Sequence, residues 1–177
     1  MKKRIIASIL TVIMLMTMLP TAAFAADGES TETGDSTTPE AAIYLDQQHG
    51  ADDNDGLSEA TAVKTIEKAN ELANAKNIKD ICLSSFYRVT GTETWDLGGK
   101  TLHRYGLGGY MIELVNASAS LTLSNVVIDG AEYTVDATHA AETDSIIKAA
   151  NGGTIVLNSG AILQNNKAAP FGSGILA

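Results

Sequence analysis

The chain has 177 residues, with 12 basic and 21 acidic side chains and a formal net charge of −9. An acidic surface repels phosphate backbones, so the composition argues against nucleic acid as a partner. Cys82 is the single cysteine, which excludes an intrachain disulfide, and its apolar neighbours predict a buried strand position rather than a reactive thiol.

Residues 1–25 have the features of a secretory signal peptide. Residues 2–4 are basic, residues 5–19 are apolar and uncharged, and the Ala-Phe-Ala at 23–25 predicts cleavage after Ala25. The alternative is a membrane anchor, but an apolar run of 15 residues falls short of the ~20 that span a bilayer. Cleavage removes three basic residues, which leaves nine against 21 acidic ones and a net charge of −12. The expected location is extracellular, secreted or on a bacterial cell surface.

Residues 26–41 predict an acidic flexible linker. Asp and Glu alternate there with Ser, Thr and Gly, and the segment has no basic or large apolar side chain. Such a segment cannot bury enough surface to offset its ordering entropy. The remaining residues, 42–177, are enough for one domain.

The domain is predicted to begin with a short strand at 42–46, an Asn- and Asp-rich turn at 49–58 and a helix at 65–75. The helix places its apolar side chains on one face at spacings of three and four; they are Ile66, Ala69, Leu72 and Ala73. Beyond Asn77 the helical period disappears, and short apolar strands alternate with Gly, Asn and Ser corners.

The acidic run 52–56 raises the possibility of a calcium site, because calcium prefers oxygen ligands at alternate positions. Aligned on Gly56, however, the calcium-loop template places Ala51 at the first ligand and Ala62 at the twelfth. An Asx-rich turn that starts the helix is therefore favoured over calcium binding, with the nearby Asp46 keeping calcium open as an alternative.

Two stretches of the chain repeat one pattern. Asn116 and Asn151 are 35 residues apart, Leu121 and Ile155 are 34 apart, and Ile128 and Leu163 are 35 apart. A fixed period of this length indicates stacked structural units. An earlier unit aligns at an offset of 26, which predicts three inward columns: Trp95, Leu121 and Ile155; Leu97, Leu123 and Leu157; Leu102, Ile128 and Leu163.

Three segments carry a resemblance to a known superfamily: YLD at 44–46 with DNDGLS at 53–58 and KTIEKA at 64–69; LGGKTL at 97–102; and LQNNKA at 163–168 followed by GSGI at 172–175. The chain resembles the right-handed parallel β-helix superfamily, the pectate-lyase-like solenoids. It is most similar to bacterial secreted and surface proteins with polymorphic-outer-membrane-type repeats. The resemblance implies an all-β fold, a right-handed parallel β-helix solenoid of about three coils with an N-terminal capping α-helix.

The resemblance is specific for fold and weak for activity, because lyases, glycosidases, adhesins and stalks share that architecture. Lyases of the superfamily hold calcium with carboxylates and use a basic residue as base. Basic residues after Asn77 are few, and none lies beside an acidic cluster in the aligned columns. No catalytic, cofactor-binding or metal-binding residue is therefore assigned, and no cofactor is expected apart from the open calcium alternative.

Several residues have a structural and a functional interpretation. Asn116 and Asn151 favour an internal ladder, in which equivalent side chains bond each other and the corner backbone, over an N-glycosylation sequon at 116–118. His49, His103 and His139 are scattered, which makes zinc improbable.

Carbohydrate contact has its own candidates. Asp129 with Glu132 or Asp136 could flank a sugar as glycosidase carboxylates do, but loop acids are common. Tyr105 and Tyr110, in a Gly-rich corner, are better candidates for sugar stacking than Trp95, which is expected in the core.

The leading hypothesis is a secreted or cell-surface module acting in adhesion or as a structural stalk, with carbohydrate or host-surface ligands as partners. The rival hypothesis is a polysaccharide lyase or glycoside hydrolase whose active site lies beyond residue 177. The last residues begin a new unit without a polar cap, which predicts the N-terminal fragment of a larger protein.

Overall fold

The computed structural model describes residues 41–132, 145–149, 151–166 and 174–176. They all belong to one compact unit, Thr37–Ala177. The predicted signal peptide, the predicted linker up to residue 40, and the loop residues Asp136 and His139 lie outside the described residues.

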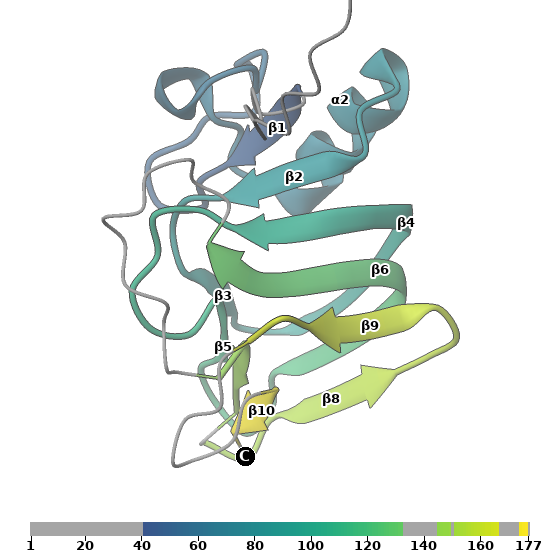
Figure 1. Cartoon of the computed structure of the whole chain (residues 1–177). Helices are drawn as coiled ribbons and strands as arrows, with labels where there is room; N and C mark the ends of the chain where they lie inside the picture. The colour runs from purple at the N-terminus through teal and green to yellow at the C-terminus, as the bar shows by residue number, and fades with distance from the viewer. Residues whose placement is uncertain (1–40, 133–144, 150, 167–173, 177) are drawn as a thin grey trace, which may run out of the picture. The chain divides into compact units, whose positions relative to one another are not determined.

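The larger of two sheets is parallel throughout and runs in the order β1 (Ala42–Leu45), β2 (Asp80–Leu83), β4 (Thr92–Arg104), β6 (Ser120–Glu132) and β8 (Thr154–Leu157). β9 (Ala161–Gln164) also pairs with β6, beyond the part that β8 occupies. Figure 1 shows β1, β2, β4 and β6 stacked one below the other in sequence order, with β9 and β8 below β6. β8 and β9 each pair with β6, along different parts of that strand.

The smaller sheet is also parallel and has the order β10 (Ile175–Leu176), β7 (Ile147–Lys148), β5 (Ile112–Leu114) and β3 (Tyr87–Val89). Its edge strand β3 is covered at one position by a side chain instead of a strand. The amide of Gln47 accepts from the backbone N–H of Arg88 at 2.8 Å and donates to the Arg88 carbonyl at 3.2 Å.

The helix α2 (Ile66–Lys76) follows a short 3₁₀ turn, η1 (Glu59–Thr61), and confirms the predicted helix at 65–75 to within one residue. The Thr65 hydroxyl accepts from the backbone N–H of Lys68 at 3.2 Å, and the helix ends at Asn77 in a left-handed conformation. Its buried face packs against β1 and β2 at one end of the larger sheet (Figure 1) and consists of Ile66, Ala69 and Ala73.

The core is a set of aliphatic columns that cross the larger sheet. One column runs through Ile43, Ile81, Leu102 and Ile128, all with no exposed surface, and continues to Leu163. This column confirms two predicted pairs, Leu102 with Ile128 and Ile128 with Leu163. Burying aliphatic side chains is the main favourable term in folding, so these columns stabilise the stack without disulfides.

The predicted place of Trp95 is wrong by two residues. Trp95 pairs with Leu123, and Glu93 takes the position opposite Leu121. The cause is a bulge in which Leu97, Gly98 and Gly99 of β4 face a single residue of β6, with φ values of 60° and 81° at the two glycines. A bulge shifts register on one side of it only, so one offset cannot describe the whole strand.

The predicted fold class, an all-β right-handed parallel β-helix solenoid, is corrected by the structure. Helix makes up 12% and strand 45% of the described residues, an α/β-like mix of parallel sheets, and no closed solenoid is seen among them. A period of about 34 residues indicates that equivalent strands of successive units pair in parallel. Two parallel sheets that the chain enters in turn, as it does in β3, β4, β5 and β6, satisfy that period equally well.

Candidate functional site

The outer face of the larger sheet carries a regular set of hydroxyl groups. Register places Thr92, Ser120 and Thr154 side by side across β4, β6 and β8, with Thr94 and Thr122 two residues further along. We call these five residues the hydroxyl surface. The threonines at 92, 94 and 154 are exposed and the other two are half-buried, and none makes a side-chain hydrogen bond within the described residues. Parallel strands fix their spacing at about 4.8 Å across the sheet.

Further along the same face, His103 is held by a carboxylate. Its Nε2 lies 2.7 Å from Oδ1 of Asp80, and both side chains are largely buried, at 14% and 20% exposure. His103 also pairs in register with Cys82, which is buried as predicted. No cysteine lies near His103 in the sequence, because Cys82 and His103 are brought together only by the pairing of β2 with β4.

A second carboxylate lies on the next strand. Asp129 pairs in register with His103 and with Gln164, and it is 8% exposed. Its Oδ2 accepts from the amides of Gln164 at 3.0 Å and Asn165 at 2.7 Å, and its Oδ1 accepts from the backbone N–H of Ala131. These bonds hold Asp129 in place. Of its two proposed partners, Glu132 is the last residue of β6 and Asp136 lies outside the described residues. The contact of these amides with Asp129 was not predicted, although the offset of 35 residues that aligns Ile128 with Leu163 also aligns Asp129 with Gln164.

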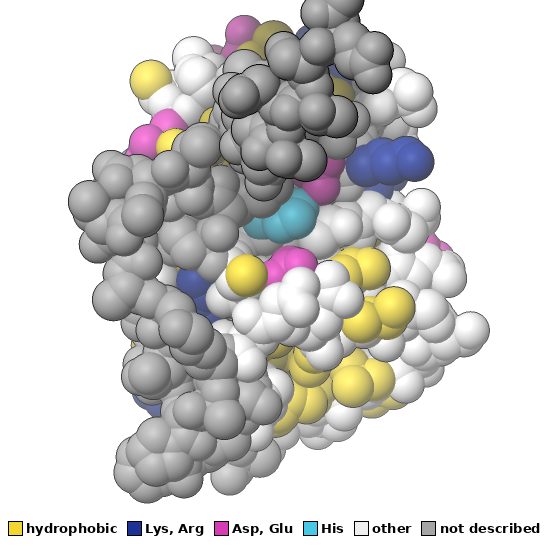
Figure 2. Space-filling view, in the orientation of Figure 1, with side chains coloured by type: hydrophobic (Ala, Val, Ile, Leu, Met, Phe, Trp, Pro, Cys, Tyr) yellow, Lys and Arg dark blue, Asp and Glu magenta, His cyan; other side chains and the backbone are white. Residues whose placement is uncertain are grey.

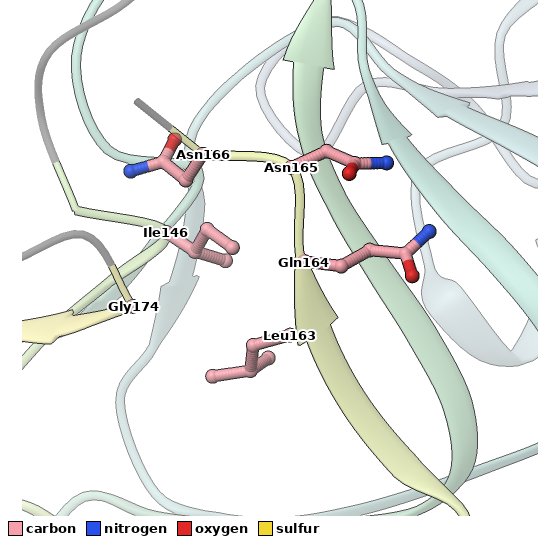
Figure 3. A pocket seen from close by; sticks show the side chains of 6 residues that line it. All are labelled: Ile146, Leu163, Gln164, Asn165, Asn166 and Gly174. Atoms are coloured by element: carbon pink, nitrogen blue, oxygen red, sulfur yellow. The ribbon is translucent and has the colours of Figure 1, made fainter. Parts of the chain in front are cut away.

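The end of β9 borders a small cavity of about 110 Å³ lined by Ile146, Leu163, Gln164, Asn165, Asn166 and Gly174. Figure 3 shows Gln164 and Asn165 pointing to one side of the strand while Asn166 and Leu163 point to the other, toward Ile146. The space holds only a few water molecules, each of which takes roughly 30 Å³. The cavity therefore suits ordered water better than an organic ligand.

Arg104 anchors the loop beside this cavity. It is fully buried, its Nε donates to the Gly130 carbonyl at 2.9 Å, and its Nη1 donates to the carbonyls of Leu107 and Gly109. Hydrogen bonds from a charged group are stronger than neutral ones. Arg104 consequently fixes the Gly-rich corner at 105–110 to the end of β6.

The acidic run at 52–56 forms a hydrogen-bonded turn. Oδ1 of Asp52 accepts from the backbone N–H groups of Lys64 and Thr65, both at 2.9 Å, and Oδ1 of Asp55 accepts from Leu57. Desolvation by burial raises the pKa of Asp52, but the hydrogen bonds from Thr65 and Lys64 outweigh it, so this pKa is lowered. These contacts are those of the Asx-rich turn. Within the described residues no three His, Cys, Asp or Glu side chains gather where a metal ion could be held.

The two tyrosines proposed for sugar stacking are engaged with other aromatic side chains. Tyr105 lies edge-on to Tyr44, with ring centroids 5.2 Å apart, and Tyr110 lies 5.2 Å from Phe86 with Lys148 Nζ over its ring at 4.7 Å. Both tyrosines are half-buried. Trp95 is 1% exposed and packs in the core, as expected.

The equivalent asparagines form the predicted hydrogen bonds to the corner backbone. The amide of Asn116 donates to the Thr90 carbonyl at 3.3 Å, and that of Asn151 donates to the Val115 carbonyl at 3.0 Å. Each asparagine thus bonds the corner backbone of the preceding unit. Ser118 donates to the Asn116 oxygen through both its N–H and its hydroxyl.

Comparison of the chain with protein-family models, curated proteins and solved structures found no match. Within the ranges that the structure describes, no helix is long and apolar enough to cross a membrane.

Proposed function

We propose that the protein is a secreted or cell-surface module that acts in adhesion or as a structural stalk, with carbohydrate-bearing surfaces as its partners. The observation that carries the proposal is the hydroxyl surface, which offers a regularly spaced set of uncharged donors and acceptors on a parallel sheet. Figure 2 shows apolar side chains gathered over β8 and β9.

The spacing of this surface favours an extended polymer. Hydroxyl groups on neighbouring strands repeat at about 4.8 Å, which is close to the repeat of sugar units in an extended glycan chain. A polymer that crosses the strands can therefore bond one strand after another. Many weak contacts of this kind add up to a useful affinity by avidity.

The test is retention of the purified protein on insoluble polysaccharides and on bacterial wall preparations. Replacing Thr94 and Thr122 by Glu places two charges on the surface, and we expect at least a tenfold loss of retention, because unpaired desolvated charges oppose binding. Leu57→Glu adds one charge at an exposed position in the turn before η1, outside the strands that carry the hydroxyl surface. It should leave retention unchanged. Failure of the unsubstituted protein to bind any such surface would contradict the proposal.

A second candidate is a carbohydrate-cleaving enzyme, and the row formed by Asp80, His103 and Asp129 favours it. Two carboxylates on either side of a histidine are suited to general acid–base chemistry on a glycosidic bond. Incubation with pectin and other glycans tests this candidate by release of new reducing ends or unsaturated products. His103→Ala is the control variant, because product release that survives in it would assign the activity to other residues or to a contaminant.

A further inference from the structure

A larger cavity, of about 440 Å³, opens where helix α2 ends and strands β1 and β2 begin. Its walls are Ala41, Lys76, Asn77, Ile78, Lys79 and Asp80. This volume falls within the range of pockets that hold small organic ligands, roughly 300–1,000 Å³. The cavity is separate from the hydroxyl surface, and it shares only Asp80 with the row of residues proposed for glycan cleavage.

Two lysines give this cavity a charge opposite to that of the chain. Lys76 and Lys79 are exposed, and neither forms an ion pair within the described residues. Other lysines of the unit do have partners: Lys68 lies 2.9 Å from Glu71, and Lys148 lies 3.3 Å from Glu113. Figure 2 shows Lys and Arg side chains gathered beside the start of β2.

The helix dipole accounts for a lysine at position 76 but not for a lysine at position 79. Lys76 is in the last turn of α2, where a cation is favoured by the negative end of the helix dipole. Lys79 follows the C-cap residue Asn77 by two positions, outside the helix. Because a lysine ammonium is strongly hydrated and mobile, two of them in one concavity attract an anion from solution without a preformed partner.

The remaining polar groups of the cavity suit hydroxyl groups. Asp80 uses Oδ1 for its bond to His103, while Oδ2 makes no hydrogen bond within the described residues. The side-chain amide of Asn77 is likewise exposed and makes no hydrogen bond there. The Oδ2 oxygen of Asp80 can therefore accept a hydrogen bond from a ligand hydroxyl.

We propose that this cavity binds a small organic anion that carries a carboxylate or phosphate group together with hydroxyl groups. Lys76 and Lys79 hold the anionic group, and Asp80 and Asn77 bond the hydroxyls. This inference goes beyond the proposed function and does not rest on it, because a soluble ligand can occupy the cavity whether or not the hydroxyl surface binds a polymer.

Calorimetric titration of the purified protein tests the proposal with gluconate, glycerol phosphate, inorganic phosphate and neutral glucose. We expect gluconate or glycerol phosphate to bind, and glucose to bind at least about tenfold more weakly because it lacks the charge-assisted contact. Preference for gluconate assigns a carboxylate ligand, and preference for glycerol phosphate assigns a phosphate ligand. Inorganic phosphate that binds as tightly as both organic anions would contradict the role given to Asp80 and Asn77.

Matched variants locate the binding. Lys79→Ala should weaken binding about tenfold, whereas Lys64→Ala removes the same charge from an exposed position before the other end of α2 and should leave the affinity within about twofold. Equal melting temperatures show that both variants fold. Binding that is lost in the first variant and kept in the second supports the site. An equal loss in both variants, or no binding of either organic anion, overturns it.

Discussion

The two ends of the larger sheet are built from the same kind of residue but differ in burial. Trp95 and Leu123 are 1% and 0% exposed, whereas Leu157, which continues their column on β8, is 47% exposed. Helix α2 packs against β1 and β2, and no helix among the described residues packs against β8 or β9. The alternation of apolar residues therefore decides which face of a strand points inward, and the cover of the sheet decides how much stability that face provides.

The largest difference is expected between two truncations in one column, one at a buried position and one at an exposed position. Leu123→Ala should lower the free energy of unfolding by about 2–5 kcal/mol, because it removes buried contacts and leaves a cavity. Leu157→Ala, at a half-exposed position, should cost about 1 kcal/mol or less. Urea denaturation of both variants measures the difference, and equal losses would show that β8 is covered as well as β6.

A smaller effect is expected at the covered end, where Asp52 supports the start of α2. Asp52→Ala removes three hydrogen bonds, to the N–H groups of Lys64 and Thr65 and to the Thr65 hydroxyl, and should cost about 1 kcal/mol at this exposed position. Asp53→Ala is the matched control, since Asp53 is exposed and makes no side-chain contact within the described residues. An equal fall in melting temperature in both variants would mean that only the change in net charge affects stability.

Much of this arrangement follows from the sequence, and the exceptions have physical causes. The helix and the pairing of Leu102 with Ile128 and Leu163 come from local periodicity and a fixed offset. The position of Trp95 does not, because glycines permit a bulge whose length no periodic pattern reveals. The neighbours of His103 also escaped prediction, since Asp80 is 23 residues away and approaches only when β2 pairs with β4. Periodicity fixes pairing between strands and says nothing about whether two sheets close on each other.

The asparagine ladder is expected to contribute to stability near the exposed end of the sheet. Asn151→Ala removes the bond to the Val115 carbonyl, and we expect a loss of about 0.5–1 kcal/mol. In a unit of this size that corresponds to a fall in melting temperature of a few degrees. Ser159→Ala changes an exposed corner whose side chain makes no contact within the described residues, so its melting temperature should match that of the unsubstituted protein. An unchanged melting temperature in Asn151→Ala would count against the ladder.

The smallest effect concerns pH. Because the pKa of Asp52 is lowered in the folded protein, its contribution to stability is present above its unfolded pKa of about 3.9 and is lost as pH falls through the folded pKa. Asp52→Asn should therefore lose less stability than the unsubstituted protein on acidification below about pH 4. Asp53→Asn should follow the unsubstituted curve. Parallel curves for all three proteins in acid denaturation would show that the turn does not depend on the Asp52 charge.

The side chain of Gln47 has a consequence for the behaviour of the protein at high concentration. An exposed strand edge is a template on which another chain can add a strand, and such addition starts aggregation. On β3, the Gln47 amide occupies both backbone groups of Arg88 with the donor and acceptor that an incoming peptide would use. One glutamine thus acts as a one-residue substitute for a strand, and it keeps this edge from recruiting a foreign one.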